Sequence, residues 1–170
     1  MLLSQSIIDA FNAQIGHELG ASHQYLAIAS YFSAENLEEL SQFFFRQADE
    51  ERTHAMKFVK FLLSADGQVV IPEVPAPQSR FSTAQEAVEK SLSWEQEVTK
   101  QIYALVELCH KEHNHIALRF LDWFVNEQLE EVSTISTLLG IVKRAGEDNL
   151  LYVEDYLARH GIAAPETAEA

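Results

Sequence analysis

Residues 68–78 read Gln68-Val69-Val70-Ile71-Pro72-Glu73-Val74-Pro75-Ala76-Pro77-Gln78. Three prolines in six residues exclude a helix here, because proline lacks a backbone N–H and biases the residue before it towards extended angles. At ~3.3 Å per residue, the segment from Gly67 to Arg80 spans up to roughly 45 Å. A helix of about 28 residues is ~42 Å long. The segment therefore predicts a crossover that runs the full length of a helical bundle.

The N-terminal side of this segment predicts two long helices. Apolar residues recur at intervals of three and four over about 6–34 and again over 37–65, which is the helical period. Asp66-Gly67 supplies a stop after the second stretch. Because only a few residues separate the two helices, we expect them to be antiparallel neighbours.

The C-terminal side predicts a second pair. Ser82-Thr83-Ala84-Gln85 is a capping-box start for a helix that ends at about residue 110. After a polar turn at 111–115, the same apolar period continues to about residue 145. Gly146 then ends this helix, and a short helix is predicted at about 149–160.

The predicted fold class is therefore all-α: a four-helix bundle with one long crossover and a short fifth C-terminal helix. We expect a single domain over residues 1–161 and a flexible acidic tail over 162–170. The alternative, in which the proline segment links two domains, would leave each half as a lone helical hairpin with an exposed apolar face. The crossover is the preferred interpretation.

Composition limits the partners. A formal net charge of -14 argues against nucleic acid, because phosphate binding needs clustered lysine and arginine. No apolar run approaches the ~20 residues of a membrane span, and no secretory leader pattern is present. The single cysteine, Cys109, excludes an internal disulfide and suits a reducing compartment. We expect a cytoplasmic protein without nucleic-acid or membrane partners.

Glu51 and His54 lie three residues apart in the second predicted helix, so they project from nearly the same face. A carboxylate beside an imidazole makes half of a transition-metal site. Alone the pair is weak evidence, since most such pairs lie on solvated helix surfaces.

The spacing recurs. Glu18 precedes Glu51 by 33 residues and His54 by 36, and Glu95 precedes two side chains, Gln128 and Glu131, at the same separations. Two hairpins related by an approximate two-fold axis would bring these six side chains together at mid-bundle. That is the arrangement of di-iron carboxylate bundles. Carboxylates with one imidazole suit iron or manganese.

Four motifs give the chain a resemblance to bacterial non-haem ferritins, over its length to about Gly161. They are His17-Glu18, Gln24-Tyr25-Leu26-Ala27, Glu50-Glu51-Arg52-x-His54-Ala55 and Trp123-Phe124-x-x-Glu127-Gln128-x-Glu130-Glu131.

The resemblance implies a ferroxidase centre in each subunit. Glu18, Glu51 and His54 would hold one iron, and Glu51 would bridge to a second iron. Glu95 and Glu131 would hold that second iron, with Gln128 close by as a hydrogen-bonding or weakly ligating group.

Further residues are implied around the pair. A third iron site would use Glu50, Glu127 and Glu130. Tyr25 would lie beside the centre as an electron donor, with Trp123 nearby; the alternative for both aromatics is core packing.

The implied activity is oxidation of Fe(II) by dioxygen, or by hydrogen peroxide, with deposition of a ferric oxo-hydroxide mineral inside a homo-oligomeric shell of 24 subunits. Iron is the expected cofactor and cargo, and the sequence identifies no reductant for iron release. Haem is not expected, because Arg52 stands where haem-binding bacterioferritins carry a ligating methionine.

Other interpretations remain open. A rubrerythrin-like oxidase or peroxidase uses the same bundle without storage, but that class usually adds a four-cysteine domain. The DNA-protecting mini-ferritins lack the terminal helix, and a metal-free interaction bundle leaves the paired acids unexplained. The turn histidines His110, His113 and His115 would lie near three-fold pores in a ferritin shell, where they could guide entering ions. Exposed histidines in a turn more often have no functional role.

Overall fold

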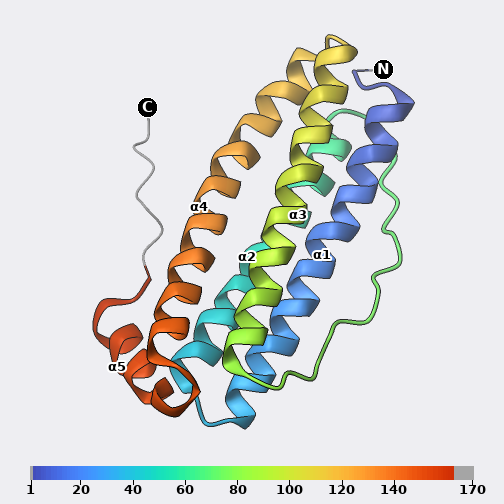
Figure 1. The fold of residues 1–170 in the computed structure, drawn as a ribbon. Helices are drawn as coiled ribbons and strands as arrows, with labels where there is room; N and C mark the ends of the chain where they lie inside the picture. The colour runs from blue at the N-terminus through green and yellow to red at the C-terminus, as the bar shows by residue number, and fades with distance from the viewer. Residues whose placement is uncertain (1, 163–170) are drawn as a thin grey trace.

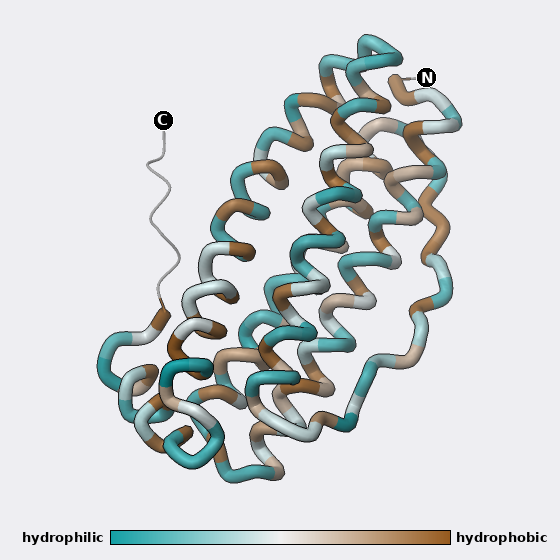
Figure 2. Tube along the Cα trace, in the orientation of Figure 1, coloured by the Kyte–Doolittle hydropathy of each residue, from teal (hydrophilic) through white to brown (hydrophobic). Residues whose placement is uncertain are grey.

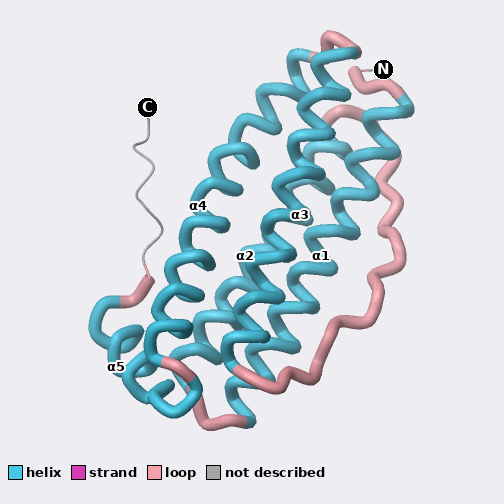
Figure 3. Tube along the Cα trace, viewed as in Figure 1, coloured by secondary structure: helices cyan, strands magenta, loops and turns pink. Residues whose placement is uncertain are grey.

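The computed structural model describes residues 2–162, and all regular structure within them is helical (Figure 3). Four long helices run side by side (Figure 1). They are α1 (Gln5–Ala34), α2 (Glu38–Ser64), α3 (Ala84–Lys111) and α4 (His115–Ala145). A 3-10 turn at Glu147–Asn149 leads into the short helix α5 (Leu150–His160) at one end of the bundle.

The structure confirms the predicted all-α fold. Figure 1 shows that α1 and α2 are antiparallel and that the connection from α2 to α3 runs back along the whole bundle beside α1. Each helix begins and ends within about two residues of the predicted position, the usual uncertainty of helix boundaries. The acidic tail predicted over 162–170 lies outside the described residues from 163 onward.

Two buried amide side chains of α1 fix the crossover. Asn12 donates to the carbonyl of Gln68 at 2.9 Å and accepts from the N–H of Val70 at 2.9 Å. Twelve residues further along α1, Gln24 pairs in the same way with both backbone groups of Gln78, at 2.8 and 3.0 Å. Each side-chain amide thus forms hydrogen bonds with backbone N–H and C=O groups of an extended segment that has no neighbouring strand to pair with. Between them, Gly16 gives Pro72 room, since a Cβ at that glycine would lie 2.5 Å from Pro72 Cγ.

The stop after α2 lies at Asp66-Gly67, as predicted. Asp66, not Gly67, adopts the left-handed conformation, with φ of 57°. The N–H of Gly67 donates to the carbonyl of Leu62 at 2.8 Å, and that of Asp66 to Leu63 at 3.3 Å, which together form a Schellman motif. Glycine suits position 67 because the backbone passes close to Leu62 there. A Cβ added to Gly67 would lie 3.2 Å from the Leu62 carbonyl oxygen.

The capping box at the start of α3 is shifted by one residue from its predicted place. Thr83 is the N-cap and accepts from the N–H of Glu86 at 3.0 Å. The Glu86 carboxylate in turn accepts from the N–H of Ser82 at 2.7 Å. The predicted pairing of Ser82 with Gln85 was therefore wrong by one position, because Thr-x-x-Glu supplies the stronger acceptor.

The apolar core has two halves, one towards each end of the bundle. Figure 2 shows that hydrophobic and hydrophilic residues are interspersed along each long helix. On α1, for example, Ile15 belongs to one half and Ala21 to the other. On α2, Ala48 and Ala55 mark the same division. The stretch between the halves carries buried polar side chains on every long helix. Among residues 2–162, no helix combines the length and the apolarity that crossing a membrane requires.

Candidate metal centre

A buried polar layer crosses the middle of the bundle, and all four long helices contribute to it. Its members are at most 4% exposed. They are Glu18 from α1, Glu51 and His54 from α2, Glu95 from α3, and Gln128 and Glu131 from α4. The structure thus brings together all six residues that the spacing singled out.

This layer holds four carboxylates, and no lysine or arginine within residues 2–162 is buried with them. Burying a carboxylate without a partner is costly, because the protein interior solvates charge poorly. His54 is the only basic side chain among the six. The layer therefore lacks the positive charge that would neutralise it.

Two groups within the layer have ligand atoms close enough to hold a metal ion. Atoms of Glu18, Glu51 and His54 lie within 4.8 Å of one another, and so do atoms of Glu51, Glu95 and Glu131. Glu51 belongs to both groups. This is the position expected of a ligand shared between two cations, as the resemblance implied, although ligation itself stays a prediction.

The shared glutamate also has an unsatisfied atom. Glu51 Oε2 is buried and has no hydrogen-bond partner among the residues that the structure describes. It lies 3.4 Å from His54 Nδ1, in a geometry that does not make a hydrogen bond. A buried acceptor of this kind needs a donor or a cation. Carboxylate oxygens with one imidazole nitrogen form a donor set that fits iron or manganese.

Neighbouring side chains orient the acids. Tyr25 donates its hydroxyl hydrogen to Glu95 Oε1. Gln128 donates through Nε2 to Glu95 Oε2 at 3.3 Å and to Thr99 Oγ1 at 3.1 Å, so in this arrangement it is a hydrogen-bond donor. Gln14 Nε2 donates to Glu18 Oε1 at 3.0 Å. Such outer contacts fix the direction of a ligand.

Gln14 and Thr99 were not predicted from the sequence. The only available signal was the i, i+4 spacing of Gln14 and Glu18, which many helices share.

Burial dominates the electrostatics of the layer. Desolvation, followed by the charge of Glu95, raises the pKa values of Glu51 and Glu131 well above the ordinary range. Desolvation raises the pKa of Glu95 to about 7, even though hydrogen bonds from Tyr25 and Gln128 oppose the rise. Burial lowers the pKa of His54, but Glu127 and the buried acids outweigh it and the net direction is upward. The metal-free layer therefore retains protons that a metal ion would displace.

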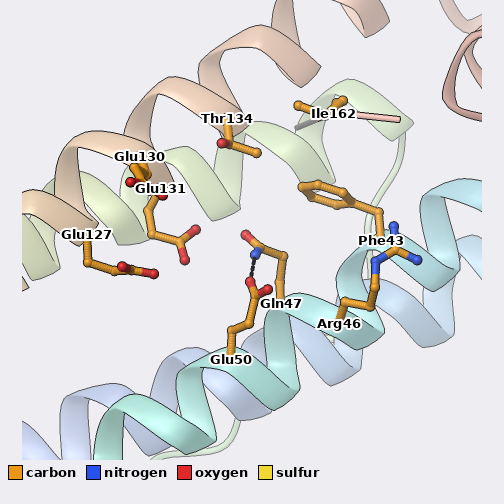
Figure 4. A pocket seen from close by; sticks show the side chains of 9 residues that line it. All are labelled: Phe43, Arg46, Gln47, Glu50, Glu127, Glu130, Glu131, Thr134 and Ile162. Carbon is orange, nitrogen blue, oxygen red and sulfur yellow. Dashed lines mark hydrogen bonds between the residues drawn. The ribbon is translucent and has the colours of Figure 1, made fainter. Parts of the chain in front are cut away.

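A second group of acids adjoins the first. Glu50, Glu127 and Glu130 line a cavity of about 170 Å³ between α2 and α4, together with Glu131 (Figure 4). Glu127 Oε1 lies 3.6 Å from His54 Nε2. Burial raises the pKa of Glu50, and a hydrogen bond from Gln47 opposes this. The three residues predicted as a third site thus line one cavity, but Glu50 and Glu130 belong to none of the close ligand groups.

The remaining candidates lie around the layer. Trp123 contacts the His54 ring edge-to-face, with ring centroids 5.3 Å apart, and Lys57 Nζ lies 3.8 Å above the indole. The three turn histidines are exposed and belong to none of the close ligand groups. Cys109 is fully buried, as expected of a small apolar residue.

Comparison with known proteins agrees with this geometry. Residues 8–145 match the model of the ferritin-like domain. The chain is 42% identical to ferritin BfrB of Mycolicibacterium smegmatis over 151 residues, covering 89% of this chain and 83% of that protein. It is 37% identical to the bacterial non-heme ferritin of Staphylococcus aureus over 153 residues, covering 89% and 92%.

Among solved structures, an open-pore ferritin of the hyperthermophilic archaeon Archaeoglobus fulgidus superimposes with a TM-score of 0.90 at 32% identity. The match covers 94% of this chain and 98% of that one. The domain model matches most of the chain, the relatives have nearly the same length, and the solved structure has the same fold. These findings lead to one assignment. The chain belongs to the ferritin family.

Proposed function

We propose that this protein is an iron-storage ferritin with ferroxidase activity. Each subunit would bind two Fe(II) ions as substrate in the buried layer, oxidise them with dioxygen and pass the ferric product to the cavity of a 24-subunit shell. Iron storage is supported by family membership. The observation that carries the ferroxidase step is the pair of ligand groups that share Glu51, buried without a compensating lysine or arginine.

The two iron positions have different surroundings. One would take Glu18 and His54 beside Glu51, and the other would take Glu95 and Glu131. The first therefore has a neutral imidazole where the second has a carboxylate. Anionic oxygen ligands favour the ferric state, so we expect the second position to stabilise Fe(III) more strongly.

The oxidation balances without a further cofactor. Two Fe(II) ions give up one electron each, and dioxygen takes both electrons with two protons to form hydrogen peroxide. The protons displaced from the acids of the layer when the metal binds lie close to where they are consumed. Hydrogen peroxide is a second possible oxidant for the same pair.

The adjoining acidic cavity would hold a third iron on Glu50, Glu127 and Glu130. Its position beside His54 supports this, because Glu127 is the acid closest to His54 Nε2 on the cavity side. Tyr25 would act on the centre through its hydrogen bond to Glu95. The buried free thiol of Cys109 agrees with a reducing, cytoplasmic location.

The double variant Glu51→Ala with His54→Ala tests this proposal. It removes the shared ligand and the only imidazole, so the initial rate of aerobic Fe(II) oxidation, followed by absorbance, should fall by about two to three orders of magnitude. Size-exclusion chromatography supplies the control, because wild type and variant should both elute near 24 subunits.

Two outcomes would contradict the proposal. If the double variant oxidised iron at the wild-type rate, the reaction would take place elsewhere. A dimeric wild-type particle would remove the storage cavity and favour a rubrerythrin-like oxidase.

A further inference from the structure

The acidic cavity between α2 and α4 is lined by two matching helix faces. Phe43, Arg46, Gln47 and Glu50 follow one another on α2 at offsets of three, one and three residues. The α4 residues Glu127, Glu130, Glu131 and Thr134 repeat those offsets. Since α2 and α4 are antiparallel, the acidic end of the α2 face lies opposite the acidic start of the α4 face (Figures 1 and 4). Gln47 and Thr134 thus lie further towards α5 than Glu50 and Glu127 do.

Two buried oxygen atoms on these faces have no hydrogen-bond partner within the described part of the chain. Gln47 is 6% exposed and Thr134 is 7% exposed, yet Gln47 Oε1 and Thr134 Oγ1 make no hydrogen bond to any of residues 2–162. The direction of the Gln47 amide is set, because its Nε2 donates to Glu50 Oε2. Figure 4 shows its oxygen on the side of the amide away from Glu50, towards α4. An amide oxygen is an acceptor only, so it needs a donor or a cation.

Carboxyl groups lie next to these neutral oxygens. Glu131 is one helical turn from Thr134, and Glu50 is one turn from Gln47. Neutral amide and hydroxyl oxygens bind hard divalent cations, but more weakly than carboxylates do. A cavity of about 170 Å³ also leaves space for a cation that keeps some of its water.

We propose that Gln47 Oε1 and Thr134 Oγ1, with Glu131 and water, form a further, weaker cation subsite on the α5 side of the acidic cavity. It takes a hard or borderline divalent cation and lies beyond the Glu50, Glu127 and Glu130 group. The inference rests on the proposed function only in taking iron as the natural cargo.

Crystals of the full-length assembly soaked with Zn²⁺ alone test the subsite, since zinc is redox-inert and scatters anomalously. We expect an anomalous peak about 2.0–2.4 Å from both Gln47 Oε1 and Thr134 Oγ1, at lower occupancy than the peaks in the buried layer. An anaerobic Fe(II) soak should give a peak at the same place. An ordered water alone at that position would overturn the proposal.

The same anomalous maps test the buried layer and the proposed subsite separately. Peaks in the buried layer without one at Gln47 and Thr134 would overturn only this inference. An empty buried layer would overturn the proposed function.

Thr134→Val and Thr134→Ser form a matched pair for solution measurements. Valine keeps the shape of threonine and removes its hydroxyl group, whereas serine keeps the hydroxyl. In Zn²⁺ titrations by calorimetry, we expect the weakest class of sites to lose about tenfold or more in affinity in Thr134→Val and to be retained in Thr134→Ser.

Equal Zn²⁺ binding by the two variants would contradict the inference. Thermal melting of the metal-free forms shows whether folding is affected. We expect Thr134→Val to be no less stable than wild type, because the hydroxyl it removes is unpartnered.

Discussion

Glu95 is the residue in which the competing forces of the site are most visible. It is completely buried, which favours its neutral form, yet Tyr25 and Gln128 both donate hydrogen bonds that favour its charged form. The outcome is a pKa of about 7. A small change in either donor should therefore move its ionisation across neutral pH.

Tyr25→Phe tests this balance. Removing the hydroxyl takes away a hydrogen bond to the charged carboxylate, so the pKa of Glu95 should rise further. Because metal binding requires the carboxylate, the pH below which Zn²⁺ is released should be higher in Tyr25→Phe than in wild type, by roughly one unit for each ~1.4 kcal/mol of lost hydrogen bonding. Zn²⁺ titrations over a pH series measure the midpoint. At pH ~9, where Glu95 is ionised in both proteins, the affinities should converge. An unchanged midpoint would mean that Tyr25 does not control Glu95.

The sequence predicted the six members of the buried layer, because a repeated separation of 33 and 36 residues is visible along the chain. It did not predict Gln47 or Thr134. Their importance depends on an unsatisfied atom, and satisfaction is a property of three-dimensional neighbours. The part played by Gln128 was left open, and the structure gives its Nε2 three acceptors on α3.

At the scale of elements, α5 completes the start of α2. The N-cap residue of α2, Leu37, has no side chain that can cap the helix. Glu154 of α5 accepts from the N–H groups of Glu39 and Leu40 at 2.7 and 3.0 Å instead. A carboxylate at a helix N-terminus also interacts favourably with the helix dipole. The short helix is thus connected to the bundle by charge as well as by its buried Val153 and Leu157.

Glu154→Gln should weaken this connection. The neutral amide retains one acceptor oxygen but loses the charge and the two-oxygen arrangement, so we expect about 1 kcal/mol less stability in chemical denaturation of the metal-free protein. Asp155→Asn is the matched control, because Asp155 is exposed and, among residues 2–162, pairs only with Arg159 of α5, at 2.8 Å. That variant should change stability by about 0.5 kcal/mol or less. Equal effects of the two substitutions would contradict the capping role.

Helix positions were predictable because periodicity and stop signals are local. The contact of Glu154 with α2 was not, since it joins residues 115 positions apart. The crossover is an intermediate case. Its prolines predicted an extended path, but the two amides of α1 that bind it, Asn12 and Gln24, carried no signal of that role.

At the scale of the whole molecule, the two apolar halves of the core hold a layer that disfavours folding in the absence of metal. The folded protein gives Glu51, Glu95 and Glu131 raised pKa values, so between about pH 4.5 and 7 it binds more protons than the unfolded chain. Stability contributed by these groups is present at acidic pH and is lost as the pH rises through their folded values. The metal-free protein is therefore weakest where the carboxylates are charged.

Metal removal tests this prediction. The apparent melting temperature of the metal-free assembly should fall as the pH is raised from about 5.5 to about 8, and less steeply in Glu95→Gln, which has no titratable group at that position.

Zinc binding tests the same layer from the metal-bound side. Zn²⁺ at ~100 times its Kd should increase the free energy of unfolding by about 2.7 kcal/mol for each equivalent site at pH 8, and by less at pH 5.5, where protons compete. The Glu51→Ala, His54→Ala variant, which keeps Glu95 and the residues of the acidic cavity, should gain less from zinc than wild type at either pH. If the metal-free protein became more stable as the pH rose, or if zinc stabilised the double variant as much as wild type, the buried layer would not be what couples metal binding to folding. The fold would then be stable with its buried carboxylates charged, and it would not require a cation in the buried layer.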